Sequence, residues 1–306
     1  MASPVRSLRR LRGGVRLGTA ALRPHAPERV VLSVCVDGDE NRVAGAATVG
    51  VSALERIHAR LGLGGAVTWF INQRYRWTER QPELLRRLLE SGDRLELHGH
   101  AEKLIAAGEG AALREFLADQ LSSLTTFCRQ VQPGYQVECF RSGSLERSPE
   151  LYQVLEELGI RYDSTLAPGY RRKVYGRMVD DTDLPANRNC YYLEARDYKR
   201  PQPKPCQIVE IPLMLAEVRP VRAVLKGPDQ PVVLATLVHP YALMGGRGRL
   251  NWRAALSYEL MLRALLRIAG GRALTLRAAG EKWREAHPGP VASGQWSVAR
   301  AMGRSR

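Results

Sequence analysis

Short apolar runs alternate with longer amphipathic stretches along most of the chain. Residues 30–36 and 66–71 are continuous apolar runs rich in β-branched side chains, which is typical of buried strands. Residues 110–131 and 252–269 repeat their apolar positions every three to four residues, as a helix does. The same patterns predict strands at 94–97, 137–140, 160–163, 207–211, 232–238 and 273–276, and helices at 51–61, 81–91 and 148–158. Repeated strand–helix units predict an α/β fold with parallel strands and helical crossovers.

Three segments fall outside this alternation. Residues 1–28 and 286–306 are rich in arginine, and we expect them to be flexible basic arms on either side of one domain that spans 29–285. Residues 165–206 are rich in Pro, Arg and Tyr and have weak periodicity, which predicts an irregular excursion. No glycine-rich phosphate-binding motif follows the first strand, so a nucleotide-binding fold gains no support.

Polar side chains with chemical capability recur where the predicted strands end. They are Asp37, His98, Arg141, Asp163 and His239. A doubly wound sheet and a barrel both satisfy the alternation of elements. In a barrel, the carboxyl ends of the strands converge on one face, where active sites are built. The recurrence of polar residues at these ends therefore favours a barrel.

The first two of these positions suggest a metal site. One carboxylate with imidazoles suits Zn²⁺ or a similar divalent ion, which makes Asp37 and His98 candidate ligands. If the chain turns helical after the strand at 94–97, Glu102 shares a face with His98 and completes a ligand set. His100 then points elsewhere, toward a position behind the ligands. The alternative is that these are loop residues that satisfy backbone groups.

Two later positions suggest acid–base chemistry. Arg141 follows an apolar strand directly, and burying an arginine there is costly without a carboxylate partner. It is placed to orient an active-site acid or to contact substrate, and the alternative is a surface ion pair. His239 follows another apolar strand and is a candidate general acid or base, because histidine titrates near neutral pH. Its alternative is a capping or core histidine.

The charge of the chain narrows the class of partner. Lys and Arg total 46 against 31 Asp and Glu, which gives a net charge of +15. This balance favours anionic partners such as nucleic acid, acidic glycans or a membrane surface. The basic ends lack the interleaved aromatic residues that stack on bases, which argues against nucleic acid.

The cysteines and the apolar runs bear on the compartment. No two cysteines form a C-x-x-C pair, and an odd number predicts free thiols in a reducing compartment. No run reaches the length of a membrane span, and no apolar core follows the basic residues near the start. We therefore expect a cytoplasmic protein without a membrane span. The cysteines are Cys35, Cys128, Cys139, Cys190 and Cys206.

Several segments, taken in order, resemble the polysaccharide deacetylase family, carbohydrate esterase family 4. The apolar strand at 66–71 is similar to a family strand, and the histidine-containing segment 91–100 resembles the family's metal-binding stretch. The matching segments are AVTWFI (66–71), QPELL (81–85), SGDRLELHGH (91–100), FRSG (140–143), LEELGIRYDST (155–165), IVEIP (208–212) and LVHP (237–240). The resemblance covers residues 30–285 and rests on the order and spacing of these motifs rather than on any one of them.

The resemblance implies a distorted (β/α)7 barrel that acts as a hydrolase. It implies a divalent metal, usually zinc, held by Asp-His-His, which polarises water and the amide carbonyl. It further implies a neighbouring aspartate as base and a late histidine that protonates the leaving amine. Substrates of the family are N-acylated sugars or glycans such as chitin oligomers or peptidoglycan, and some relatives deformylate lipid-linked sugars.

The sequence departs from the family pattern at the first and second motifs. The family has two acids in its first motif, either adjacent or two apart. In one alignment Asp37 is the metal ligand and Cys35 stands at the base position; in the other Asp37 is the base and Asp39 the ligand. Glu102 stands where the family has its second histidine, and His100 is the alternative third ligand.

Two readings follow from the resemblance and its departures. In the first, the chain is a carbohydrate N-deacetylase with metal at Asp37, His98 and Glu102 or His100. Asp39 is then the remaining candidate base, Arg141 orients the catalytic carboxylate, and His239 is the acid. In the second reading, the barrel has lost its base and binds a glycan or a partner protein. Nucleic-acid binding by the basic ends is a third option.

Overall fold

The computed structural model describes most of the chain between residues 29 and 288. The described residues are 29–38, 46–72, 81–174, 177–185, 187–193, 198–199, 206–214, 221, 224–225, 231–245 and 248–288. The candidate Asp39 and the basic arm at 1–28 lie outside them, as does nearly all of the expected C-terminal tail. Roles assigned to these segments stay predictions.

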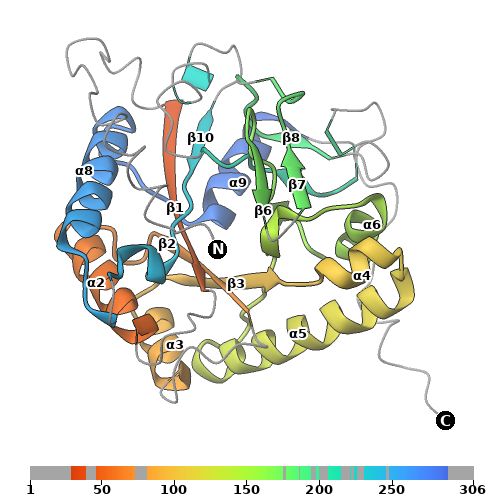
Figure 1. Ribbon diagram of the computed structural model, residues 1–306, viewed down its shortest axis with the longest axis horizontal. Coiled ribbons are helices and arrows are strands. Elements are labelled where there is room, and N and C mark those ends of the chain that lie inside the picture. Colours follow the sequence, from red (N-terminus) through yellow and green to blue (C-terminus); the bar gives the residue numbers. More distant parts are fainter. Residues whose placement is uncertain are drawn as a thin grey trace.

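The core of the molecule is a curled sheet of mostly parallel strands (Figure 1). Its order is β10-β1-β2-β3-β4-β5-β9-β8, and every neighbouring pair is parallel except β8 with β9. A parallel bridge between Leu213 and Ala235 joins the chain after β9 to β10, so the two ends of the parallel set meet. This confirms the predicted distorted (β/α)7 barrel. The strands are β1 (Val30–Gly38), β2 (Val67–Ile71), β3 (Arg94–Gly99), β4 (Cys139–Ser142), β5 (Tyr162–Asp163), β8 (Tyr191–Tyr192), β9 (Val209–Glu210) and β10 (Val232–Ala235).

The first strand shows why the sequence builds a barrel. All nine residues of β1 are buried, and successive side chains point to opposite sides of the sheet. Val31 and Cys35 pack with Phe70, Tyr162 and other strand residues in the barrel interior. The intervening side chains of β1 join the larger cluster between the strands and the surrounding helices. Burial on both faces explains why the run at 30–36 is apolar at every position except Ser33.

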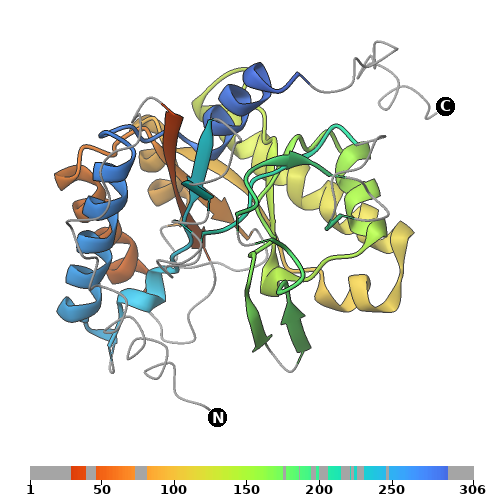
Figure 2. The same ribbon diagram turned by 90° about the horizontal axis from the view of Figure 1, so that it is seen from above.

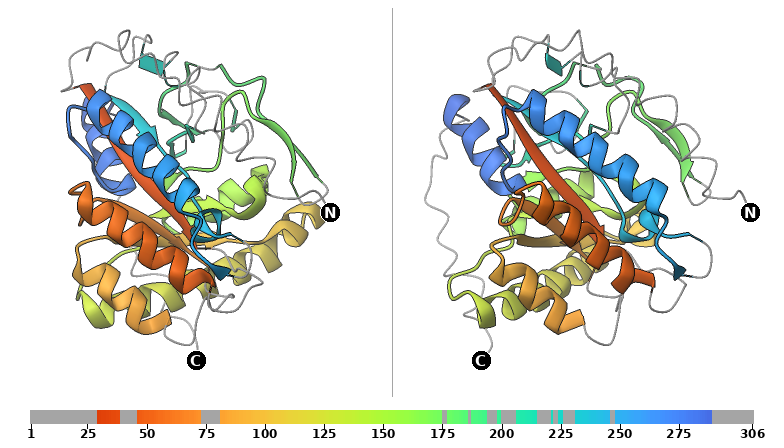
Figure 3. Two further views of the ribbon diagram at one scale, coloured as in Figure 1. Left: turned by 60° about the vertical axis from the view of Figure 1, so that its left-hand side comes forward. Right: turned by 90° about the vertical axis from the view of Figure 1, so that its left-hand side faces the viewer.

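Helices cover the outside of the barrel (Figures 1 and 3). Several begin at residues that cap backbone N–H groups: Ser148, Asn251 and Thr275 accept from Leu151, Ala254 and Ala278. Among the helices described, none combines the length and the apolar character that a membrane span requires. The helices are α2 (Ala46–Arg60), α3 (Gln81–Glu90), α4 (Glu102–Ala107), α5 (Gly110–Val131), α6 (Pro149–Glu157), α8 (Trp252–Ile268) and α9 (Leu276–Ala286).

Two segments differ from the elements predicted for them. Residues 273–276 were expected as a strand, but only Ala273 makes a β-bridge, and Thr275 then caps helix α9, which the sequence reading missed. The excursion at 165–206 was expected to be irregular, yet it contains the hairpin β6 (Arg171–Val174) and β7 (Arg177–Asp180). Both features are local: Thr275 caps a helix that begins at the next residue, and β6 pairs with the strand that follows it, although the apolar pattern of neither segment indicates this.

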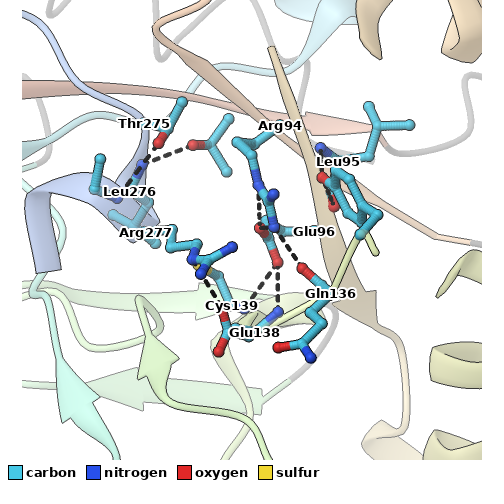
Figure 4. A network of polar contacts seen from close by, with 12 residues as sticks. Arg94, Leu95, Glu96, Gln136, Glu138, Cys139, Thr275, Leu276 and Arg277 are labelled. Carbon is cyan, nitrogen blue, oxygen red and sulfur yellow. Dashed lines mark hydrogen bonds and ion pairs between the residues drawn. The ribbon is translucent and has the colours of Figure 1, made fainter. Parts of the chain in front are cut away.

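A polar network joins the amino-terminal ends of the strands to α9 (Figure 4). Glu96 is fully buried, and its Oε2 accepts from the backbone N–H groups of Glu138 and Cys139 at 2.9 and 2.8 Å. Its Oε1 accepts from Arg94 at 2.9 Å. Arg277 of α9 lies 2.7 Å from Glu138 Oε2. These contacts lock β3, β4 and α9 together at the end of the barrel opposite the candidate site.

Candidate active site at the carboxyl ends of the strands

A buried ion pair stands where β1 and β4 end. Arg141 Nη1 donates to Asp37 Oδ1 at 2.5 Å, and the two residues are 0% and 2% exposed. They come from strands separated by β2 and β3 in the sheet, so their side chains meet across the barrel interior. The sequence predicted that Arg141 would need a carboxylate partner, and the structure brings it to Asp37.

Three further contacts fix the side chain of Arg141. Its Nε donates to the Ser164 carbonyl oxygen at 2.8 Å, and its Nη2 donates to Ser164 Oγ at 3.1 Å. Its guanidinium carbon also lies 4.2 Å from the centre of the Phe70 ring. Burial opposes its charge, but Asp37 raises the pKa of Arg141 above its ordinary value. A fixed guanidinium in turn fixes the direction of the Asp37 carboxylate, a role for Ser164 and Phe70 that the sequence analysis missed.

The other oxygen of Asp37 is oriented toward His239. Asp37 Oδ2 lies 4.0 Å from His239 Nε2, and the histidine side chain is 22% exposed. The His239 ring stacks on Tyr241, with ring centres 4.7 Å apart. Tyr241 belongs to the 3₁₀ turn Pro240–Leu243 that follows the histidine. A buried carboxylate and a partly exposed imidazole therefore share one location at the barrel mouth.

Cys35 lies one layer deeper in the barrel than Asp37. The two residues are two apart on β1 and so point to the same side of the strand. Cys35 is completely buried beside Ser33, with 3.8 Å between Ser33 Oγ and Cys35 Sγ. Burial raises the pKa of its thiol. A neutral thiol below the mouth is poorly suited to take a proton from water, whereas Asp37 stands next to His239.

The segment after β3 does not form the helical ligand pair that was considered for His98 and Glu102. Strand β3 continues to Gly99, and α4 begins only at Glu102, so the two residues share no helix face. His98 Nδ1 lies 2.9 Å from the Arg141 carbonyl oxygen. His100 instead pairs with Glu102, with 2.6 Å between Nδ1 and Oε1.

Glu102 has a second contact, because Ser144 Oγ donates to its Oε1 at 2.8 Å. Burial acts in the opposite direction, but the hydrogen bond and charge of His100 lower the pKa of Glu102 to about 2. The low pKa keeps the Glu102 carboxylate ionised near neutral pH, where it accepts from Ser144 and lies within hydrogen-bond distance of His100.

The described residues do not form a metal site of the expected kind. Within them, no three His, Cys, Asp or Glu side chains are grouped so that they could hold a metal ion. Asp37 Oδ1 is bonded to a guanidinium, and Glu102 is bonded to His100 and Ser144. Asp39 lies outside the described residues. The His, Cys, Asp and Glu side chains of the described residues therefore do not fit the three-ligand site that the family resemblance implies.

Comparison with solved structures identifies the architecture. A protein from Mycobacterium smegmatis that is assigned as a polysaccharide deacetylase superposes with a TM-score of 0.53 at 18% identity, over 84% of this chain and 92% of that one. The chain has the polysaccharide-deacetylase fold. PuuE allantoinase superposes with a TM-score of 0.54 at 16% identity, over 90% of this chain and 98% of that one. No protein-family model and no curated protein sequence matches the chain. At such identities the likeness concerns the fold alone.

Within this deacetylase fold, Asp163 has a different surrounding from the one the strand-end pattern suggested. It is fully buried, and Tyr152 of α6 donates to its Oδ2 at 3.2 Å while Thr165 donates to its Oδ1 at 2.7 Å. Thr165 also accepts from the backbone N–H of Ser142 at 3.0 Å. Through Thr165, Asp163 thus supports Ser142, the residue after Arg141.

The loop after β4 has an unusual backbone. Ser144 and Leu145 have φ values of 53° and 57°, in the left-handed region that side chains other than glycine seldom adopt. Gly143 is needed for a different reason, since a Cβ there would lie 2.4 Å from His100 Nδ1. The strained turn aims Ser144 at Glu102. Such strain is characteristic of functional loops, and no sequence pattern signals it.

Proposed function

We propose that the chain is a hydrolase that removes an N-acyl group from an amino sugar or glycan. One observation carries the proposal: Arg141 holds one oxygen of Asp37, and the other oxygen lies 4.0 Å from His239 Nε2. We assign Asp37 as the base and His239 as the acid, because a carboxylate and an imidazole lie close together at the carboxyl-terminal face of a barrel, where enzymes of this architecture act. The deacetylase fold supports the choice of reaction.

In the proposed reaction, Asp37 takes a proton from a water molecule as that water attacks the amide carbonyl. The new C–O bond gives a tetrahedral intermediate. His239, in its protonated form, donates a proton to the amide nitrogen as the C–N bond breaks. The products are a carboxylic acid and a free amino sugar. Arg141 does not touch the reacting atoms in this scheme; it positions the carboxylate of Asp37.

The proposed steps are assigned to side chains of this protein. The family resemblance implies zinc, but the described donors do not fit a three-ligand site. Zinc stays an expectation that metal analysis of the purified protein tests.

The substrate class is part of the proposal. All five cysteines are free and buried, which supports a reducing compartment such as the cytoplasm. A nucleotide-linked or lipid-linked N-acylated sugar fits that compartment better than finished cell wall.

A second candidate is a barrel that binds a glycan or a protein partner without turnover. The lack of a three-ligand group among the described residues favours this candidate. The hydrolase is expected to release acetate from an N-acetylated sugar, whereas the binding module is expected to bind it without release.

The discriminating experiment incubates the purified protein with chitin oligomers and, separately, with a nucleotide-linked N-acetylated sugar, measures released acetate, and determines zinc in the same samples. The hydrolase proposal expects acetate in proportion to enzyme and time. Binding of either compound without acetate release from either, in samples with and without added zinc, would support the binding module and overturn the hydrolase.

A further inference from the structure

One face of helix α8 exposes large apolar side chains. Trp252, Leu256 and Leu260 are 63%, 47% and 44% exposed and follow one another at intervals of four residues. Residues four apart lie on the same side of a helix, so the three form a continuous row, which we call the α8 stripe. The opposite side of the helix is buried through Ala254, Tyr258 and Leu262. The stripe is therefore additional to what packing against the barrel requires.

Two further exposed apolar side chains lie on or next to the elements beside the α8 stripe. Leu250, just before α8, and Val49, in the first turns of α2, are each 38% exposed. Helices α2 and α8 lie side by side on the outside of the barrel (Figure 3). Of the six large apolar side chains that are exposed among the described residues, five lie on these two neighbouring helices or directly before α8, and only Met178 lies elsewhere.

Arginines surround the stripe. Arg249, Arg253, Arg263 and Arg267 are all exposed, and the guanidinium carbon of Arg253 lies 5.2 Å from the Trp252 ring centre. Glu259 is the acidic residue of α8, and it is bonded to Arg60 and to Arg263. The face that carries the stripe is therefore positively charged, in line with the net charge of +15.

The position of the stripe relates it to the candidate active site. Met244 and Leu250 form an antiparallel bridge, and the Asn251 N–H donates to the Leu243 carbonyl oxygen at 2.8 Å. These contacts tie the start of α8 to the turn that follows His239. Figure 2 shows this turn, the start of α8 and the hairpin β6–β7 toward the same side of the molecule.

We propose that the α8 stripe is a docking surface for an anionic lipid bilayer. Tryptophan and leucine on one face of a helix, with arginine beside them, suit the boundary between headgroups and acyl chains. The arginines would bind lipid phosphates while their aliphatic stems cover apolar surface.

Charge decides between a bilayer and a second copy of the chain. A two-fold dimer through this face would bring the same arginines against each other. A bilayer with anionic headgroups neutralises them instead. Docking in this way would bring the barrel mouth near the membrane, where a lipid-linked N-acylated sugar is found; this last point rests on the proposed function, whereas membrane binding does not.

Flotation with vesicles tests the proposal without any assay of turnover. The wild-type protein is expected to float with vesicles of phosphatidylcholine and phosphatidylglycerol and to remain behind with phosphatidylcholine alone. The triple variant Trp252→Gln, Leu256→Gln, Leu260→Gln should lower the bound fraction by about tenfold. Met178→Gln, which changes an exposed apolar side chain away from α8, should bind as the wild type does.

Two variants that each remove one arginine charge test the electrostatic contribution to membrane binding. Arg253→Gln should weaken binding to the mixed vesicles by about fivefold, whereas Arg86→Gln on α3, also exposed, should not. Vesicles with brominated acyl chains provide a readout on the wild-type protein itself. They should quench part of its tryptophan fluorescence, and Trp252→Phe should remove that part.

Three results would overturn the proposal. One is a wild-type protein that does not float with the mixed vesicles. Another is a triple variant that floats as well as the wild type. The third is a wild-type dimer that the triple variant makes monomeric in the absence of lipid, together with no quenching by brominated lipid, which would assign the stripe to a second copy of the chain.

Discussion

Two buried carboxylates, each bonded to an arginine, lie at opposite ends of the same barrel, and they differ in the partners of their second oxygen. At the amino-terminal end, both oxygens of Glu96 are occupied, one by Arg94 and the other by two backbone N–H groups. At the mouth, Arg141 holds one oxygen of Asp37, and the second faces His239 at 4.0 Å.

The difference separates a pair that stabilises from a pair that is available for chemistry. A buried carboxylate whose bonds are all made within the protein joins strands and has nothing left to offer a substrate. A buried carboxylate that is held from one side and open to a titratable group on the other is pre-oriented for proton transfer. The comparison predicts that substitutions at the mouth lower the catalytic rate, and that substitutions at the amino-terminal end of the barrel lower stability.

The largest effect outside the aspartate itself is expected at His239. His239→Gln should lower kcat by about 10²–10⁴-fold, because it removes the group that donates a proton to the leaving amine. The side chain is partly exposed, so the thermal midpoint should change little. Acetate release from chitin oligomers measures the rate, and a variant with wild-type turnover would remove His239 from the site.

Glu96→Gln should show the opposite pattern. A glutamine amide places an N–H₂ group against donors that the carboxylate now accepts, which should cost about 1–3 kcal/mol of stability. Turnover per folded molecule should match the wild type, because the contacts of Glu96 lie where β3 and β4 begin, whereas Asp37 and Arg141 lie where β1 and β4 end. Denaturant unfolding measures the first quantity and acetate release the second. A large loss of turnover in fully folded protein would show that Glu96 affects catalysis as well as stability.

A third buried carboxylate site sharpens the comparison through its pH dependence. Glu210 lies beside Asp163 on the neighbouring strand, and both are fully buried. Burial, together with the charge of Asp163, raises the pKa of Glu210 well above its ordinary value. A pKa raised by folding means that the contribution to stability is complete below the ordinary glutamate pKa and is lost as pH rises through the folded value.

Glu210→Gln should therefore flatten the decline in thermal midpoint that the wild type shows as pH rises above the ordinary glutamate range. Glutamine keeps an oxygen that can accept from the Leu166 N–H, which Glu210 Oε1 now does at 3.0 Å. Calorimetry across that pH range compares the two proteins. Parallel curves for wild type and variant would show that Glu210 does not titrate in this way.

The smallest effect is expected at Cys35. Cys35→Ser keeps the size and the donor capacity of a side chain that lies below the mouth, so kcat should stay within about threefold of the wild type. The same acetate assay applies. A loss of kcat as large as that predicted for His239→Gln would indicate that Cys35, rather than Asp37, is the catalytic base.

The sequence predicted the barrel more completely than it predicted the arrangement of the candidate site. Apolar runs and helical periodicity identified the parallel strands because both faces of each strand are buried, as β1 shows. Helix α9 was missed, because its start depends on the cap at Thr275 rather than on the apolar pattern before it.

At the site, the need of Arg141 for a carboxylate could be inferred from its position after a buried strand. The relative depth of Cys35 and Asp37 could not be inferred, because the period of a strand puts both on the same side and only the closed barrel sets how deep each lies. His98 and Glu102 were considered as helical neighbours, but the strand pairing of His98 with Arg141 carries β3 through Gly99. Long-range pairing of this kind leaves no local signal.

Asp37→Asn is the variant that tests the central claim most directly. Asparagine keeps an oxygen toward Arg141 but cannot take a proton from water, so the account predicts that acetate release falls by about 10²–10⁴-fold in a folded protein. The measurement is the rate of acetate release from chitin oligomers by equal concentrations of folded wild type and variant. An unchanged rate would contradict the assignment of Asp37 as the base.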